Sequence, residues 1–356
     1  MRKADIDKKN KKNKKNDKSS LKSSRYILIL GALVVIIVAI VLITAFSQNS
    51  KSYVAKVGSE KISVKEFNFY LEQVKSAMLA EAEINPDTPE AENFWKTANF
   101  DGLNATEEAK RQALDALRQL KIQVIKAKER NIKLSDEEKE SIYAQAESDA
   151  SALESDGLDA NSLKQMYTEQ YLAYKLYLNE ISSMNITDDE VKSVYDSDTK
   201  SFDKVTARHI LFSKMNTTTG EWLSEEEKAE AENKAKEILE KVNAGEDMEK
   251  LAKEYSEDPP VEENGGVYTF TKFDSYVDEF KDWAINANVG DTGIVETAYG
   301  YHVMRLENRE AVPFEDVKTS IRNSMLQEKF IELLDEWEKD PAYVVQTNDK
   351  VYNTLQ

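Results

Sequence analysis

Apolar residues recur every three or four positions through most of residues 63–201, which is the spacing of one buried face of an α-helix. One such face runs through Ala113, Leu117, Leu120, Val124 and Ala127. The pattern predicts a largely helical unit, and a short strand is predicted before it at Tyr53–Val57.

Ser or Thr followed three residues later by Glu marks many helix starts, because each side chain bonds to the other residue's backbone. Four such pairs stand before residues with helical apolar spacing: Ser63 with Glu66, Ser135 with Glu138, Thr187 with Glu190, and Ser224 with Glu227. Each pair is predicted to begin a helix.

Two prolines and a glycine interrupt the helical pattern at Pro86, Pro89 and Gly102. We therefore predict a long loop or a short irregular insertion over residues 85–104. Its aromatic residues are expected to pack locally, the alternative being that they grip another polypeptide: Phe94, Trp95 and Phe100.

Four tyrosines fall on helical spacing further along: Tyr167, Tyr171, Tyr174 and Tyr177. We interpret this stripe as part of a domain core. The alternative is an aromatic surface that holds unfolded chains.

After Phe202 the pattern changes to short β-like segments between helices and Gly/Pro turns. The predicted order is β-α-α-β-α-β-β, a small antiparallel sheet with helices, which makes an α+β domain of ordinary size. The segments with predicted bounds are a strand at Val205–Ser213, helices at Glu225–Asn243, Met248–Tyr255 and Ser275–Ile285, and a hairpin of Thr292–Thr297 with Tyr301–Glu307.

A last helical run begins at Pro313 and continues to Glu338. A lone helix cannot bury its apolar face, so this one is predicted to pack back on the helices of residues 63–201. The mixed domain would then be an insertion within a discontinuous, all-helical domain.

Residues 26–46 are 21 residues without a charge, long enough as a helix to cross the roughly 30 Å apolar layer of a bilayer. They predict a single N-terminal transmembrane helix. The basic residues 1–25, predicted to be disordered, favour a cytoplasmic N-terminus and an extracytoplasmic body. A signal peptide that is cleaved after Ser47 is the alternative.

The formal net charge of −18 conceals an asymmetry, because residues 1–25 carry 11 Lys/Arg and only 3 Asp. The body that follows is more acidic than the whole chain. Such a body disfavours nucleic acid as a partner, since phosphates require a basic surface. The chain has no cysteine, which excludes disulfides, thiolate metal sites and a cysteine nucleophile.

The only two histidines, His209 and His302, both fall on predicted strands of the mixed domain. Each one alone is more typical of a hydrogen-bonded strand residue than of a catalyst. No further ligands stand at metal-binding spacing, so no metal site is expected.

Four segments together resemble the successive signatures of parvulin-type peptidyl-prolyl isomerases, in the same order and spacing across residues 204–308. They are Ala-Arg-His-Ile-Leu at 207–211, Leu-Ala-Lys-Glu-Tyr-Ser-Glu-Asp-Pro at 251–259, Gly-Gly at 265–266 and Tyr-Gly-Tyr-His-Val at 299–303. Residues 54–67 in turn resemble the start of the chaperone domain in PrsA-like and SurA-like foldases.

The resemblance implies a role for each candidate residue. His209 and His302 would be paired core histidines, bonded to each other or through a hydroxyl such as that of Thr297, and Asp258 would lie near the substrate carbonyl. The residues implied to contact the substrate are Tyr268, Tyr276, Phe280, Thr297 and Tyr299. Two positions depart from the family, because Tyr268 stands at a usual Leu and Tyr276 at a usual Met.

The sequence thus predicts an isomerase and folding chaperone for exported polypeptides with X-Pro bonds, without cofactor or metal. The alternative is a non-enzymatic chaperone whose inserted domain only binds. A homodimer is left open. The predicted parts are residues 1–25 as tail, 26–46 as anchor, 52–201 as SurA-like helical domain, 204–308 as parvulin domain, and 313–356 as terminal helix and tail.

Overall fold

The computed structural model describes residues 53–153 and 157–355, and these group into two compact units. The first comprises the described residues of Met1–Gln73, Ala109–Ser182 and Lys329–Gln356; the second comprises Val74–Glu108 and Ser183–Glu328. The basic tail and the anchor predicted at residues 26–46 lie outside the described residues. Within the described ranges, no helix is both long enough and apolar enough to span a bilayer.

The first unit is mainly helical but also contains a three-stranded sheet of order β2-β1-β9. The expectation of an all-helical domain is therefore wrong. The buried strand β1 has backbone groups to satisfy on both edges, and β9 from the end of the chain pairs with the edge that β2 leaves open. Strand β9 has only three residues, which are too few to show the alternating pattern of a strand in the sequence. The strands are β1 (Tyr53–Val57), β2 (Glu60–Ser63) and β9 (Val345–Thr347).

Helices make up most of the rest of this unit, and all of them except α5 extend at one end into residues of the second unit. They are α2 (Val64–Glu81), α4 (Ala105–Glu129), α5 (Asp136–Ala152), α6 (Ala160–Ser183) and α12 (Phe314–Glu338). The ring of Phe330 on α12 packs against that of Tyr177 on α6, with ring centres 5.0 Å apart.

All four predicted helix starts are confirmed. In each pair the backbone N–H of the Glu donates to the hydroxyl of the Ser or Thr, and the Glu carboxylate accepts from the backbone N–H of that residue. The pairs begin α2, α5, α7 (Asp188–Ser197) and α8 (Glu225–Asn243).

The predicted loop at residues 85–104 is wrong in part, because it contains the helix α3 (Pro89–Thr97) and a hairpin of β3 (Asn99–Phe100) and β4 (Leu103–Asn104). Thr88 caps this helix by accepting from the backbone N–H of Ala91, and Pro89 suits the first helical position. Proline disfavours a helix interior but not its first position, so Pro89 starts a helix instead of interrupting one. The aromatic residues do pack locally: Phe94 lies edge to face with Trp95 and with Phe100.

The tyrosine stripe on α6 is only partly a core face. Its buried positions are instead Leu163, Met166, Ala173 and Leu176, which lie on a neighbouring face of the helix. The tyrosines follow the border of that face, and the side chain of Tyr174 is 53% exposed. The interpretation of the stripe as core is therefore wrong for Tyr174.

A buried ion cluster joins three helices of the first unit. Lys121 on α4 has no exposed surface; its Nζ lies 2.7 Å from Oε1 of Glu66 on α2 and also pairs with Glu169 on α6. Burial raises the pKa of Glu66 to about 7, because Glu169 adds to the effect of burial and Lys121 only partly offsets it. Glu66 therefore keeps its proton to a higher pH than an ordinary carboxyl.

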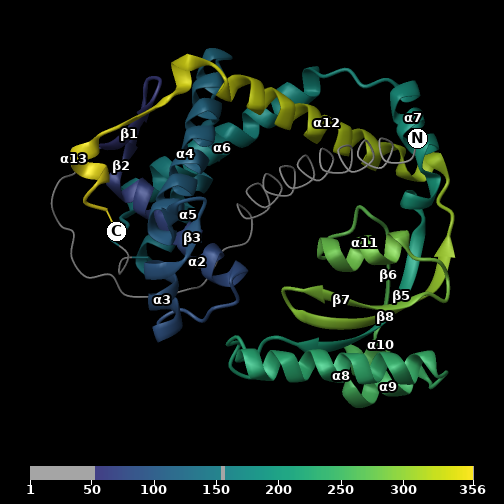
Figure 1. Ribbon diagram of the computed structural model, residues 1–356. Coiled ribbons are helices and arrows are strands. Elements are labelled where there is room, and N and C mark those ends of the chain that lie inside the picture. Colours follow the sequence, from purple (N-terminus) through teal and green to yellow (C-terminus); the bar gives the residue numbers. More distant parts are fainter. Residues whose placement is uncertain (1–52, 154–156, 356) are drawn as a thin grey trace, which may run out of the picture. The chain divides into compact units, whose positions relative to one another are not determined.

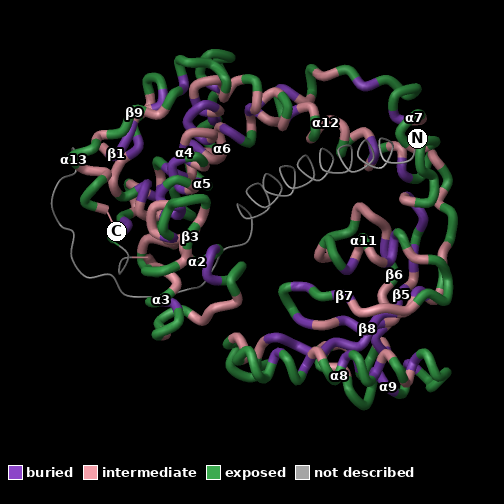
Figure 2. Tube along the Cα trace, in the orientation of Figure 1, coloured by how far each residue is buried: buried purple, intermediate pink, exposed green. Residues whose placement is uncertain are grey.

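The second unit contains a four-stranded antiparallel sheet of order β6-β5-β8-β7. Helices α8 and α9 cover one face and α11 covers the other (Figure 1), and buried positions are concentrated along β5 and β8 (Figure 2). Helix α11 begins three residues later than predicted, and the short helix α10 was not predicted. The elements are β5 (Lys204–Ser213), α9 (Met248–Tyr255), α10 (Val261–Asn264), β6 (Val267–Phe270), α11 (Asp278–Asn286), β7 (Thr292–Thr297) and β8 (Gly300–Glu310).

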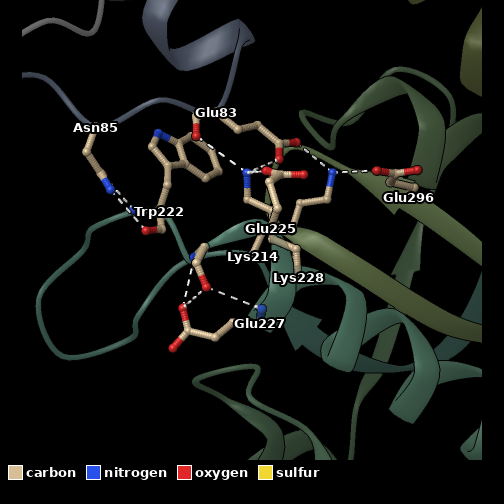
Figure 3. A network of polar contacts seen from close by, with 9 residues as sticks. Glu83, Asn85, Lys214, Trp222, Glu225, Glu227, Lys228 and Glu296 are labelled. Carbon is tan, nitrogen blue, oxygen red and sulfur yellow. Dashed lines mark hydrogen bonds and ion pairs between the residues drawn. The ribbon is translucent and has the colours of Figure 1, made fainter. Parts of the chain in front are cut away.

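A polar network within this unit joins the residues after α2 to the end of β5 and the start of α8 (Figure 3). The carboxylate of Glu83 pairs with the nearly buried Lys214 and Lys228, at 2.6 and 2.8 Å. The side chain of Asn85 donates to the backbone carbonyl of Trp222 and accepts from its N–H. Burial raises the pKa of Glu83, but the hydrogen bonds from the two lysines outweigh it and leave the pKa below its usual range.

Gly266 precedes β6 where the backbone passes very close to β5. Its amide carbonyl accepts from the N–H of His209, and a Cβ on Gly266 would lie 2.3 Å from the carbonyl oxygen of His209. The residue also has φ of +77°, which favours glycine.

Gly266→Ala is predicted to destabilise the sheet by about 2–4 kcal/mol, because it adds a backbone clash to the strain of a positive φ. Gly220→Ala is the matched control, since Gly220 has φ of +73° and open space around its Cβ position. Hydrogen exchange of the β5 and β8 amides measures the difference. Equal exchange in the two variants would show that the close approach is unimportant.

Glu66→Gln is predicted to flatten the pH dependence of the first unit's stability. The folded pKa of Glu66, about 7, lies above the ordinary value of 4.5, so its stabilisation is complete below pH 4.5 and is lost as the pH rises through 7. Glutamine resembles the protonated form and should remove up to about 3 kcal/mol of this change. Urea unfolding from pH 5 to 8, followed with a probe on α4, tests this prediction, and a Glu147→Gln variant at an exposed position is the control. If the free energy of unfolding of Glu66→Gln depends on pH as steeply as that of the wild type, the prediction is contradicted.

Candidate active site

The strand register places the candidate side chains on one face of the four-stranded sheet. His302 on β8 pairs with Leu211 on β5, two residues from His209, so the two histidines are diagonal neighbours on the same face. Tyr268 on β6 pairs with Ala207, which lies two residues before His209 on that face. This is the face that α11 covers.

The two imidazole rings are in direct contact. Nδ1 of His209 lies 3.0 Å from Nδ1 of His302, and the ring planes are inclined by 27°. Both side chains are buried, at 3% and 5% exposure. Sheet geometry alone therefore brings together residues that are 93 positions apart.

Each ring uses its second nitrogen for another polar partner. Nε2 of His209 lies 3.3 Å from Oδ2 of Asp258, and Nε2 of His302 lies 2.9 Å from the hydroxyl of Thr297. The Thr297 hydroxyl also accepts the backbone N–H of Tyr299. The result is a continuous polar chain from Asp258 through both histidines to Thr297.

The carboxylate at one end orders the protons when both rings are neutral. An ionised Asp258 only accepts, so Nε2 of His209 must carry its proton and Nδ1 must accept. His302 must then donate from Nδ1 and accept at Nε2, and the donor there is the Thr297 hydroxyl. The two histidines are thereby held in opposite tautomers.

The electrostatics agree with this order. Burial, together with the neighbouring His209, lowers the pKa of His302 to about 3, so its ring is neutral near pH 7. Burial acts to raise the pKa of Asp258, but hydrogen bonds from His209 and Tyr268 outweigh it and leave the pKa below its usual range. Asp258 is therefore an anion at one end of the polar chain, and His302 is a neutral ring within it.

Aromatic rings surround the histidines. Phe280 on α11 lies edge-on to both imidazoles, with ring centres 5.2 and 5.3 Å apart, and Tyr268 lies 5.1 Å from His209. Tyr276 stacks on Phe280 at 6.1 Å. Because Tyr268 and Tyr276 are half-buried whereas Phe280 is buried, the tyrosines form the accessible part of this aromatic wall.

The side chain of Tyr299 stands apart from the other candidates. It is 59% exposed at the turn between β7 and β8, and only its backbone N–H bonds to the polar chain, at Thr297. The structure thus brings together every candidate residue except the ring of Tyr299.

Sequence reasoning missed Phe270 and Ser256. The ring of Phe270 lies 4.6 Å from that of Tyr276, and Phe270 stands two residues after Tyr268 on the same strand, so strand alternation could have revealed it. The Ser256 hydroxyl accepts the N–H groups of Leu211 and Asp258 and so ties the Asp258 loop to β5. That contact joins residues distant in sequence and leaves no local signal.

Comparison with known proteins gives two domain matches. Residues 193–310 match the PPIC-type PPIASE domain, and residues 19–145 match the SurA-like N-terminal domain. The chain carries a parvulin-type peptidyl-prolyl isomerase domain behind a SurA-like domain. As an enzyme it is accordingly a parvulin-type isomerase.

Several relatives of the chain are named foldases. The chain is 29% identical over 281 residues to the foldase protein PrsA of Caldanaerobacter subterraneus, covering 79% of this chain and 81% of that one. It is 36% identical over 134 residues to foldase protein PrsA 3 of Bacillus anthracis, covering 35% of this chain and about half of the other (47%). A crystal structure of PrsA from Streptococcus pneumoniae is 21% identical, with a TM-score of 0.39 over 85% of this chain and 99% of that one.

Thr297→Val is predicted to destabilise the isomerase domain by about 1–3 kcal/mol, because it leaves the buried Nε2 of His302 without its partner. Thr297→Ser keeps the hydroxyl and should recover most of that loss. Hydrogen exchange of the β7 and β8 amides in the two variants measures this difference. A serine variant no more protected than the valine variant would contradict the role given to the hydroxyl.

Proposed function

We propose that the isomerase domain catalyses rotation about X-Pro bonds in exported polypeptides with the polar chain and the aromatic wall described above. The observation that supports this most directly is an ionised Asp258, bonded to His209 of the buried histidine pair, next to half-exposed aromatic rings. This arrangement offers an apolar contact for a proline ring and a fixed negative charge beside it.

The reaction to be accelerated is rotation about an amide bond that has partial double-bond character, with a barrier of roughly 18–20 kcal/mol. The planar amide draws negative charge onto its carbonyl oxygen. An anion held near that oxygen, with water excluded, disfavours this charge separation and weakens the double bond. Each tenfold gain in rate requires about 1.4 kcal/mol of such preferential stabilisation of the twisted amide.

Each candidate residue has a distinct part in this proposal. Tyr268, Tyr276 and Phe280 would hold the pyrrolidine ring, and Asp258 would face the carbonyl. His209 and His302, supported by Thr297, keep the carboxylate ionised and fixed by hydrogen bonding. Tyr299 at the exposed turn would contact the polypeptide that flanks the proline.

No covalent bond is made or broken in this step, so the mechanism requires neither a nucleophile nor a cofactor. Among residues 53–153 and 157–355, no group of three or more His, Asp or Glu side chains is arranged to hold a metal ion.

We further propose that residues 26–46 anchor the protein in the cell membrane, with residues 1–25 in the cytoplasm and the body outside it. The supporting features are the uncharged run, the basic residues before it and the foldase names of the relatives. The clients would then be exported polypeptides that fold at the outer surface of the membrane, held by the mainly helical first unit.

The alternative function, a domain that binds proline segments without turnover, is favoured by Tyr268. Its ring adds bulk where the family has leucine, which narrows the space for a proline ring. Isomerisation and holding of unfolded chains are therefore worth measuring separately.

Asp258→Ala in the full-length protein is predicted to reduce the isomerisation of an Ala-Pro peptide at least about tenfold, through loss of transition-state stabilisation. Exchange NMR spectroscopy measures the interconversion directly. Suppression of client aggregation by the same variant should be unchanged, since the substitution removes only a half-buried side chain of the isomerase domain.

Two outcomes would decide against this account. If the wild-type protein at high concentration leaves the exchange rate of the peptide unchanged, the binding-only alternative stands. If Asp258→Ala retains full activity, the carboxylate has no part in the reaction.

A further inference from the structure

Tyr268 makes a contact that its place in the aromatic wall does not require. Its hydroxyl donates to Oδ2 of Asp258 at 2.7 Å, the shorter of the two hydrogen bonds that the structure gives this carboxylate. Parvulins usually have a leucine at this position, and a leucine side chain could not donate this hydrogen bond. The contact is therefore a feature of this chain's own sequence.

The two bonds to the carboxylate share one oxygen. His209 approaches Oδ2 from β5, and Tyr268 approaches the same atom from β6. The backbone position of Tyr268 is set by its pairing with Ala207 on β5. Two donors anchored on neighbouring strands leave the carboxylate little freedom to rotate. They also leave Oδ1 as the oxygen that can face a substrate.

The surroundings keep the two donors in place. The titratable groups that act on Asp258 are His209 on β5, Tyr268 on β6 and His302 on β8. Burial and the neighbouring Asp258 raise the pKa of Tyr268, so its phenol stays protonated and remains a donor throughout the working pH range. The backbone N–H of Asp258 is separately held by the hydroxyl of Ser256.

We propose that Tyr268 is a positioning residue of this isomerase: its hydroxyl binds Oδ2 of Asp258 and holds the carboxylate ionised, with Oδ1 directed to the substrate. The proposal rests on the function proposed above for Asp258. It implies that the acid limit of activity is set by the tyrosine as well as by the histidine, because loss of the bond favours protonation of the carboxyl.

Tyr268→Phe, which keeps the ring and removes only the hydroxyl, provides the direct test. In the full-length protein labelled with ¹³C, the titration midpoint of the Asp258 carboxyl should move to higher pH, and Asp258→Asn identifies its signal. The acid limb of kcat/KM for an uncharged Ala-Pro peptide should move in the same direction. Tyr268→Leu, an independent variant that also lacks the hydroxyl, should shift both in the same way.

Tyr301→Phe is the matched control, because Tyr301 lies on β8 and packs on the opposite face of the sheet, against the α8 side. It should leave the midpoint of Asp258 and the acid limb in place. In an Asp258→Asn background, Tyr268→Phe should cause no further shift of the pH profile, since the charge through which it acts is gone.

An Asp258 midpoint that stays the same in Tyr268→Phe would overturn the proposal, as would a midpoint that moves while the acid limb does not. The titration of Asp258 requires no turnover, so its midpoint can be measured even if the wild-type protein proves inactive. Failure of the proposed function, seen as no turnover in wild type, is thereby distinguished from failure of the positioning role.

Discussion

The hydrogen bond between Nδ1 of His209 and Nδ1 of His302 is the interaction on which the site depends. It forms only if β5 and β8 pair in a single register, because a shift by one residue would turn one imidazole to the opposite face of the sheet. Gly300 allows this pairing at the start of β8, since a Cβ there would lie 2.1 Å from the carbonyl oxygen of Phe212 on β5, and Gly266 allows the similarly close approach of the β6 end to β5. The fold and the site are therefore specified by the same backbone contacts.

The polar chain is costly to bury and is stable only when every member is satisfied. Thr297 supplies the partner at one end and Asp258 supplies it at the other, where the chain meets the half-exposed tyrosines. In the proposed mechanism a charge held at that boundary would act on a bound amide, and the histidines behind it would only hold the carboxylate. The proposed site would thus place a fixed charge next to the substrate, and the other members of the polar chain would keep that charge in position.

Much of the second unit could be predicted from the sequence, because its helices and strands have strong periods and clear start signals. Helices α8 and α9, which begin at Glu225 and Met248, and strand β7 match their predicted bounds. The His209–His302 pairing required the resemblance to a known family, since no local pattern joins residues on different strands. The bond between Tyr268 and Asp258 was not predicted, because the resemblance indicates only that a tyrosine is larger than the usual leucine and not what its hydroxyl contacts.

The first unit was harder to predict for related reasons. Strand β9 has only three residues, and the buried Lys121 cluster unites three helices whose charged residues look solvent-exposed in the sequence. Both features depend on contacts between distant segments of the chain.

The chain has only two histidines, so the protons of the polar chain can be located by ¹⁵N NMR of the ring nitrogens without interference. In mildly alkaline solution, where both rings are neutral, we expect opposite tautomers: His209 protonated at Nε2 and His302 protonated at Nδ1. Protons on the same-named nitrogen of both rings would contradict the ordered chain from Asp258 to Thr297, and with it the basis of the proposed catalytic site.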